Sequence, residues 1–333
     1  MSGAAYWLPL FFAAAMGLAM LMYVILDGFD LGIGMLLPWV DEPTKDLMIA
    51  AIGPFWDANE TWIVLGVGIL LMAFPAAHGL VLTTLYIPVT LMLLGLVLRG
   101  IAFDFRVKAG DKHRARWNRA FFFGSLLAAV CQGWMLGEFI TGFRGGVTGL
   151  AFSLLIALCL PALYIMLGSG WLLIKTDGEL FRRPLLWARA AFLPMGAGLL
   201  LISIATPLVS PAIADKWFSL PNFFYLAVVP LLTAILFFRL WQVLFRRAET
   251  LKDKPRQVYV SLVGICVLAT VGLGYSLFPD IVIGQLGLWE AAADAKSLMF
   301  AFWGTVCVVP AIFAYTFLIY RIFAGKATQL TYE

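Results

Sequence analysis

The sequence predicts an all-α integral membrane protein with about nine transmembrane helices. Of its 333 residues, 62% are hydrophobic and only 13% are charged, about half the charged share of a soluble domain. The apolar residues form long continuous runs, as membrane-spanning helices require, rather than the short alternating segments of a transmembrane barrel. The basic residues lie in short segments between these runs, so the net charge of +4 predicts no nucleic-acid partner.

In chain order, the apolar runs predict spans at residues 7–27, 54–74, 79–102, 120–140, 149–173, 188–208, 221–243, 258–278 and 298–320. No basic residue precedes the first run, which is also too long for a signal peptide, so we expect a retained helix. The second and third spans are separated only by residues 75–78. No loop is long enough for a soluble domain, so we expect one transmembrane domain over residues 1–333. Its first four spans (about 7–140) and next four (about 149–278) are compatible with two bundles.

The basic residues are distributed unequally between the two sides of the predicted membrane. Under strict alternation of nine spans, all but three of the 23 Lys and Arg residues fall on one side. The exceptions are Arg144, Lys216 and Lys296. Because cytoplasmic loops carry the excess of basic residues, the N-terminus is predicted outside and the C-terminus in the cytoplasm.

The sequence offers no recognisable cofactor ligands. Membrane haem proteins use axial His or Met side chains that project from helices. The chain has two histidines: His78 in the short outer turn before the third span, and His113 in a basic cytoplasmic segment. Methionine in apolar helices is usually a packing residue, and the four cysteines form no CxxC pair. We therefore expect this chain itself to bind no haem, metal or nucleotide.

Acidic residues gather where the first three spans reach the cytoplasmic side. Asp27 and Asp30 end the first span, and Asp57 and Glu60 begin the second; each pair is three residues apart, so its members are neighbours on one helix face. Arg99 and Asp104 lie near the end of the third span. Ionisable groups in a membrane are costly and usually mark a pathway or an ion pair. We expect four carboxylates and one or two arginines to meet in one inner-leaflet pocket, with Trp56, Asn59, Arg99 and Asp104 as its supporting residues.

Residue chemistry leaves three interpretations of this cluster open. Acids in the first turn of a helix that begins near Pro54 complement the helix dipole, and Arg99 could tie three helices together by ion pairs. The second interpretation is a proton-conducting or ion-binding role, and the third is a substrate site.

The same segments resemble a known family. Residues 26–34, LDGFDLGIG, and residues 54–62, PFWDANETW, resemble the paired signature of subunit II of cytochrome bd-type quinol oxidases. Arg99 with FDFR at 103–106, SLFP at 276–279 and LWEA at 288–291 extend the resemblance from the first span to the last. The chain is short beside the longer members, as in the cyanide-insensitive branch.

The resemblance implies one subunit of a terminal oxidase in the bacterial cytoplasmic (inner) membrane. A homologous subunit I would hold the haems, b-type and d-type or b-type only, and would oxidise quinol and reduce O2 to water with protons from the cytoplasm. Subunit II would pack against it as two four-helix bundles plus one extra helix. A small single-helix third subunit is common in the family, and a structural quinone or membrane lipid can be bound.

The resemblance also implies residue roles. Asp57 matches the aspartate that lines a proton path at the subunit interface, Asp27 and Asp30 match the acids at the same inner end, and Glu60 has a more variable counterpart. Two other functions compete. A proton- or ion-coupled secondary transporter should show helices interrupted in mid-membrane and an inverted repeat. A purely structural scaffold would need no acids beyond those that cap helices.

Overall fold

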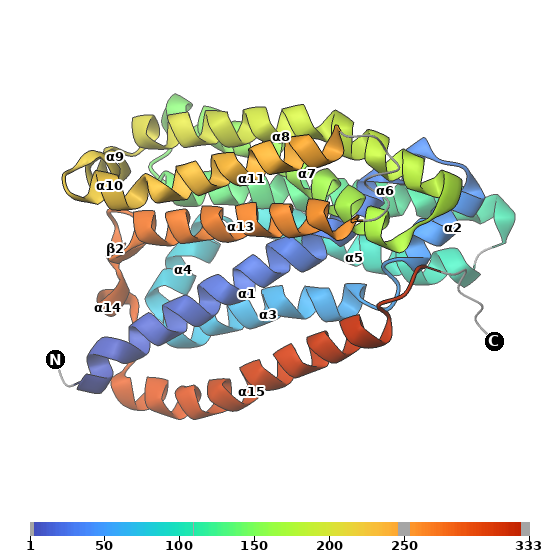
Figure 1. Ribbon diagram of the computed structural model, residues 1–333. Helices are drawn as coiled ribbons and strands as arrows, with labels where there is room; N and C mark the ends of the chain where they lie inside the picture. The colour runs from blue at the N-terminus through green and yellow to red at the C-terminus, as the bar shows by residue number, and fades with distance from the viewer. Residues whose placement is uncertain (1–2, 109, 246–253, 328–333) are drawn as a thin grey trace.

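The computed structural model describes residues 3–108, 110–245 and 254–327 and confirms the predicted all-α membrane fold (Figure 1). The long helices are α1 (Gly3–Leu36), α3 (Trp56–Ala73), α5 (Tyr86–Lys108), α6 (Asp111–Ile140), α7 (Gly146–Lys175), α8 (Arg182–Val209), α11 (Val228–Leu244), α13 (Arg256–Leu277) and α15 (Ala295–Ile322). They run side by side; α1 begins at one end of the bundle, and α15 ends at the other.

Short elements connect these helices at the two ends of the bundle. They are η1 (Leu37–Trp39), α2 (Glu42–Ala50), α4 (Pro75–Thr84), η2 (Gly178–Phe181), α9 (Pro211–Phe218), α10 (Asn222–Leu226), the antiparallel strands β1 (Asp280–Val282) and β2 (Leu286–Gly287), and α14 (Leu288–Ala291). In Figure 1, α2 lies at the right-hand end, whereas α9, α10, β2 and α14 lie at the left-hand end. The connectors therefore cap the ends and leave the sides of the bundle to the long helices.

Among the described residues, eight helical segments are long and apolar enough to cross a membrane. The remaining predicted span, 54–74, is α3, which has 18 residues and a polar first turn. Figure 1 shows α3 running beside α1 between the two ends of the bundle, so it makes the additional pass. In its polar first turn, Asn59 is buried in the bundle whereas Asp57 is exposed.

Several predicted boundaries were wrong, and three of them bear on the site. The first span does not end at residue 27, because α1 continues to Leu36 and buries its whole last third. The third does not start at 79: residues 79–84 belong to α4, and α5 begins at Tyr86, where Pro88 is accommodated in a first turn. The fourth begins earlier than 120, because α6 starts at Asp111. As a result His113 lies in a helix rather than in a segment between spans.

The core of the molecule is the crossing of α1 and α7, and glycines make it possible. A Cβ at Gly32 would overlap the backbone carbonyl of Tyr164, and one at Gly168 would lie 2.8 Å from the backbone nitrogen of Ile33. Small residues let helix backbones approach closely in membranes. The Gly28–Gly32 pair of the sequence is therefore a packing site, with the ring of Tyr164 against Gly28.

Candidate functional site

Asp27 and Arg99 form an ion pair inside the bundle. The Arg99 Nη1 atom lies 2.6 Å from Asp27 Oδ1, and its Nη2 atom contacts Glu60 Oε1. Asp27 and Arg99 are excluded from solvent, whereas 27% of the Glu60 side chain is exposed. One guanidinium on α5 thus joins a carboxylate of α1 to one of α3. Asp27 is nine residues from the end of α1 at Leu36, about 14 Å along the axis. The ion pair therefore lies further from the helix end than predicted.

Asp30 occupies a second branch of the same cluster and has a different partner. Its Oδ2 atom accepts a hydrogen bond from Asn59 Nδ2 at 2.8 Å. The same amide nitrogen donates to the carbonyl of Leu26 at 3.3 Å, and Asn59 Oδ1 accepts from the Tyr320 hydroxyl at 3.0 Å. Asp30 and Asn59 are fully buried. Among the described residues no cation pairs with Asp30, so a neutral amide is its partner.

A polar chain that the sequence did not reveal continues from Asp27 toward the middle of the bundle. Tyr23 lies one turn before Asp27 on α1 and accepts a hydrogen bond from Gln132 Nε2 at 2.7 Å. Tyr164 on α7 donates to Gln132 Oε1 at 2.6 Å. Gln132 stands within an otherwise apolar stretch of α6. A lone amide in a predicted span is a signal that could have identified this group, because uncompensated polar groups are costly in a membrane.

Asp57 and Asp104 do not join the buried cluster. Both side chains are exposed on this chain, and neither makes an ion pair among the described residues. The expectation of one pocket holding four carboxylates was therefore wrong. Three carboxylates, Asn59 and Arg99 come together, whereas Asp57 lies on the exposed face of α3. Trp56 and Phe103 pack with ring centroids 4.9 Å apart, so Trp56 supports the contact between α3 and α5.

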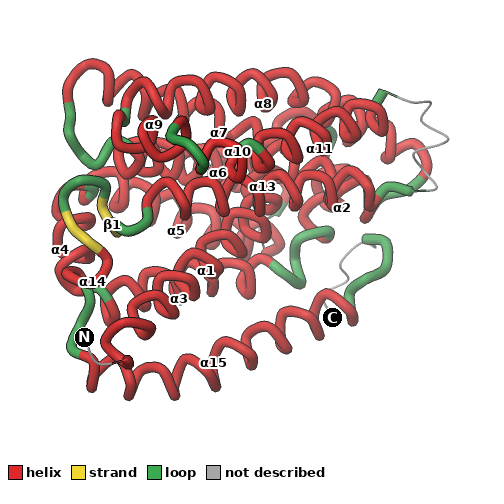
Figure 2. Tube along the Cα trace, turned by 60° about the vertical axis from the view of Figure 1, so that its left-hand side comes forward, coloured by secondary structure: helices red, strands yellow, loops and turns green. Residues whose placement is uncertain are grey.

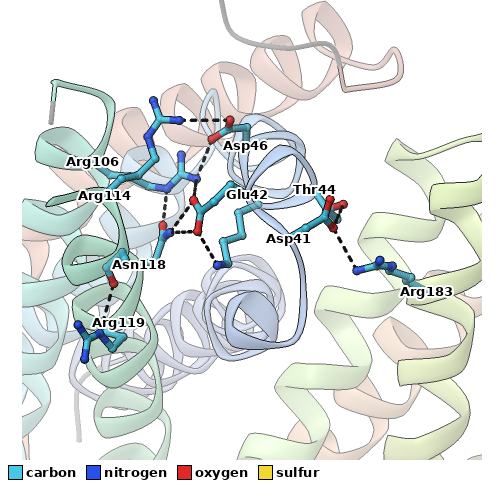
Figure 3. A network of polar contacts seen from close by, with 11 residues as sticks. Asp41, Glu42, Thr44, Asp46, Arg106, Arg114, Asn118, Arg119 and Arg183 are labelled. Atoms are coloured by element: carbon cyan, nitrogen blue, oxygen red, sulfur yellow. Dashed lines mark hydrogen bonds and ion pairs between the residues drawn. The ribbon is translucent and has the colours of Figure 1, made fainter. Parts of the chain in front are cut away.

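A separate network ties α2 to α5 and α6 at the basic end of the molecule (Figure 3). The Arg106 Nη2 atom lies 2.7 Å from Asp46 Oδ1, and Arg106 Nε donates to Asn118 Oδ1 at 2.5 Å. Asn118 Nδ2 in turn donates to Glu42, which also pairs with Lys45 at 2.7 Å. Partial burial opposes ionisation of Glu42, but the hydrogen bonds from Lys45 and Asn118 and the nearby charges outweigh it and lower the pKa of Glu42.

Neither histidine belongs to the buried cluster around Arg99. His78 lies on α4 at one end of the bundle, and His113 lies at the start of α6 at the other. Within the described ranges, no group of three or more His, Cys, Asp and Glu side chains is arranged to hold a metal ion. α1 also runs unbroken through Asp27 and Asp30, unlike the interrupted helices expected at a transporter site.

Comparison with known proteins places these features in a family. The model of the family "Cytochrome bd terminal oxidase subunit II" matches residues 8–323. The chain belongs to this subunit II family. It is 26% identical to cytochrome bd-I ubiquinol oxidase subunit 2 of Escherichia coli (strain K12) over 359 aligned residues, which cover 94% of this chain and 93% of the relative.

A second relative and a solved structure agree with the subunit II assignment. Cytochrome bd ubiquinol oxidase subunit 2 of Bacillus subtilis (strain 168) is 40% identical over 126 residues, 37% of this chain and 36% of the relative. The structure of bd oxidase from Geobacillus thermodenitrificans contains a chain with the same fold, with a TM-score of 0.75 and 18% identity over 95% of this chain and 98% of that one. The chain is therefore a multi-pass membrane protein and one subunit of a bd-type terminal oxidase, as the sequence predicted.

Proposed function

We propose that this chain is the haem-free subunit II of a quinol:O2 oxidoreductase. In this proposal it supports assembly of a haem-bearing subunit I, and its carboxylates supply that subunit with protons from the cytoplasm for the reduction of O2 to water. The similar subunits of E. coli and B. subtilis bear the name of ubiquinol oxidases, which supports quinol as the electron donor of the complex.

The observation that carries the proposal is the exposed face of α3. Its exposed positions include Asp57, Thr61, Val64, Gly68 and Leu71, which recur every three or four residues and so form one stripe along the helix. Apart from Thr61, whose hydroxyl donates to the backbone carbonyl of Asp57, the stripe is apolar up to its inner end, where Asp57 stands. An unpaired carboxylate facing hydrocarbon is costly, so a protein partner that covers this stripe is the favoured environment for Asp57. We propose that this partner is subunit I.

The proposed proton path enters at this face. Asp57 lies on the exposed face of α3. Glu60, one turn further along the same helix, is partly exposed and bound to Arg99. Asp27 and Asp30 lie behind Glu60 in the interior. The alternation of exposed and buried carboxylates, with Asn59 and Arg99 between them, supports proton entry along the interface of α3 with its partner. Asp104 is exposed on the neighbouring helix α5 and would line the same entrance.

The remaining parts of the proposal follow from family membership. Haems b and d, or b only, would lie in subunit I, because neither His78 nor His113 stands in the interior of the bundle. A small third subunit, a structural quinone or a membrane lipid would complete the assembly. The N-terminus would lie outside the cell and the C-terminus in the cytoplasm. Fusions of a compartment-sensitive reporter after Glu333 and beside Lys216 test this orientation, and activity on the same side for both would contradict it.

The proposal is tested by bulky substitutions on two exposed helix faces. Val64 on α3 has 68% of its surface exposed, and Leu193 on α8 has 72%. A tryptophan is tolerated where lipid covers the helix, whereas it disrupts a packed helix interface. Val64→Trp should therefore reduce the haem that co-purifies with tagged subunit II, as read from the visible spectrum, and Leu193→Trp should not. Equal haem recovery in both variants would contradict contact with subunit I through α3.

A further inference from the structure

We propose that Tyr320, on the last turn of α15, is a positioning residue for the Asp30 carboxyl group. This inference rests on the proposed role of Asp30 in proton supply. Tyr320 does not touch Asp30. It acts through Asn59, whose side chain lies between them and makes hydrogen bonds to both.

The amide of Asn59 can take only one orientation in this surrounding. Its Nδ2 group donates to Asp30 Oδ2 and to the Leu26 carbonyl, and both of these atoms are acceptors. Its Oδ1 atom therefore faces the third neighbour, the Tyr320 hydroxyl, which donates at 3.0 Å. A rotated amide would place its oxygen against two acceptors, and a buried polar group without a partner costs free energy. Tyr320 thus completes the set of contacts that aims the Asn59 amide at Asp30.

Tyr320 is itself held firmly although α15 lies at the edge of the bundle. Figures 1 and 2 both show α15 along one side of the molecule, next to α1 and α3. The Tyr320 ring packs against Phe55 and Trp171, with centroids 4.6 Å and 5.6 Å away. The two helix ends are joined as well, because the Lys175 ammonium at the end of α7 donates to the backbone carbonyls of Phe323 and Gly325.

Two features favour a negative charge on Asp30: the nearby Arg99 guanidinium and the hydrogen bond from Asn59, which is its described direct contact. A donor to a carboxylate stabilises its ionised form. Loss of the Tyr320 hydroxyl should loosen the amide and so weaken the hydrogen bond that stabilises the ionised form of Asp30. The other titratable or charged groups around this site are Asp27, Glu60, Arg99, Tyr164, Lys175, Tyr259 and Cys266.

The test compares Tyr320→Phe with a matched variant of the same helix in the complete oxidase. Tyr320→Phe keeps the packed ring and removes only the hydroxyl. Tyr315→Phe removes a hydroxyl from an exposed position of α15 (57% exposed). Quinol-driven O2 consumption is measured against pH, with haem content as the measure of assembly. We expect the pH profile of Tyr320→Phe to move to higher pH and that of Tyr315→Phe to stay with the wild type.

An infrared measurement separates this inference from the proposed function. The carboxyl band that disappears in Asp30→Asn identifies Asp30, and it should shift in Tyr320→Phe but not in Tyr315→Phe. An unshifted band overturns the positioning role, whatever the turnover. Full turnover of Asp30→Asn with a normal pH profile instead overturns the proton role of Asp30. If Tyr320→Phe fails to assemble, Lys175→Met loosens the same end of α15 without changing Tyr320, and it should shift the band in the same way; an unshifted band there also overturns the inference.

Discussion

Arg99 and Asp27 form an ion pair in which both side chains are excluded from solvent and the Nη1 and Oδ1 atoms are 2.6 Å apart. The pair links α1 to α5, and Glu60 of α3 contacts the same guanidinium. Removing one partner of a buried pair leaves the other charge uncompensated. One guanidinium therefore links three helices through two ion pairs.

We predict that Arg99→Met lowers the stability of the protein by about 3–5 kcal/mol, because Asp27 is left buried without its cation. The double variant Arg99→Met with Asp27→Leu should recover much of this loss, since it buries no unpaired carboxylate at that position. Thermal unfolding in detergent, followed by the helical circular dichroism signal, measures both. Wild-type stability of the single variant would show that the ion pair is not needed.

The crossing of α1 and α7 predicts a sharp difference between two glycines of one helix. Gly32→Ala should prevent close packing, since the new Cβ would overlap the Tyr164 carbonyl, whereas a Cβ at Gly17 meets no atom within 4 Å. The cost at Gly32 should reach the range of overpacked cores, about 1–3 kcal/mol or more. Protein yield and thermal stability of Gly32→Ala and Gly17→Ala provide the comparison. Similar behaviour of the two variants would argue against the observed crossing.

Glu42 predicts a pH-dependent contribution to stability. Its pKa is lowered in the folded protein, so its contribution is complete above the unfolded value of about 4.3 and is lost as the pH falls through the folded value. Glu42→Gln should therefore be less stable than the wild type at neutral pH, and the two should converge once the pH has fallen below the pKa of Glu42 in the folded protein. Melting temperatures across this range test the prediction. A difference that stays constant with pH would mean that the charge of Glu42 has no part in it.

Hydropathy predicted the membrane fold well, because membrane spans need long apolar runs whatever their neighbours are. The prediction failed where charged residues were taken to mark the end of a helix. Asp27 and Asp30 suggested that the first span stops, yet α1 continues to Leu36, since Arg99 and Asn59 from other helices compensate the two acids. The break between α4 and α5 was missed because residues on both sides of it are apolar.

The site was predicted in part for a similar reason. The sequence placed Asp27, Asp30, Glu60 and Arg99 at one end of three helices, which the structure brings together. It could not tell that Asp57 and Glu60, three residues apart, separate into an exposed and a bound position, because that depends on where α5 presents Arg99. Tyr320 was out of reach for sequence analysis, since 261 residues separate it from Asn59.

Oxygen consumption by an Asp57→Asn oxidase tests the central claim most directly. Asparagine keeps the shape of the side chain but cannot carry a proton. With subunit I assembled and the reduced haem spectrum normal, quinol-driven O2 consumption should fall on the order of 100-fold, the low end for loss of a proton-transferring group. Asp215→Asn, which changes an exposed acid of α9 at the other end of the molecule, should keep full activity. Normal turnover of Asp57→Asn between about pH 6 and 8, around the physiological range, would contradict proton supply through this chain.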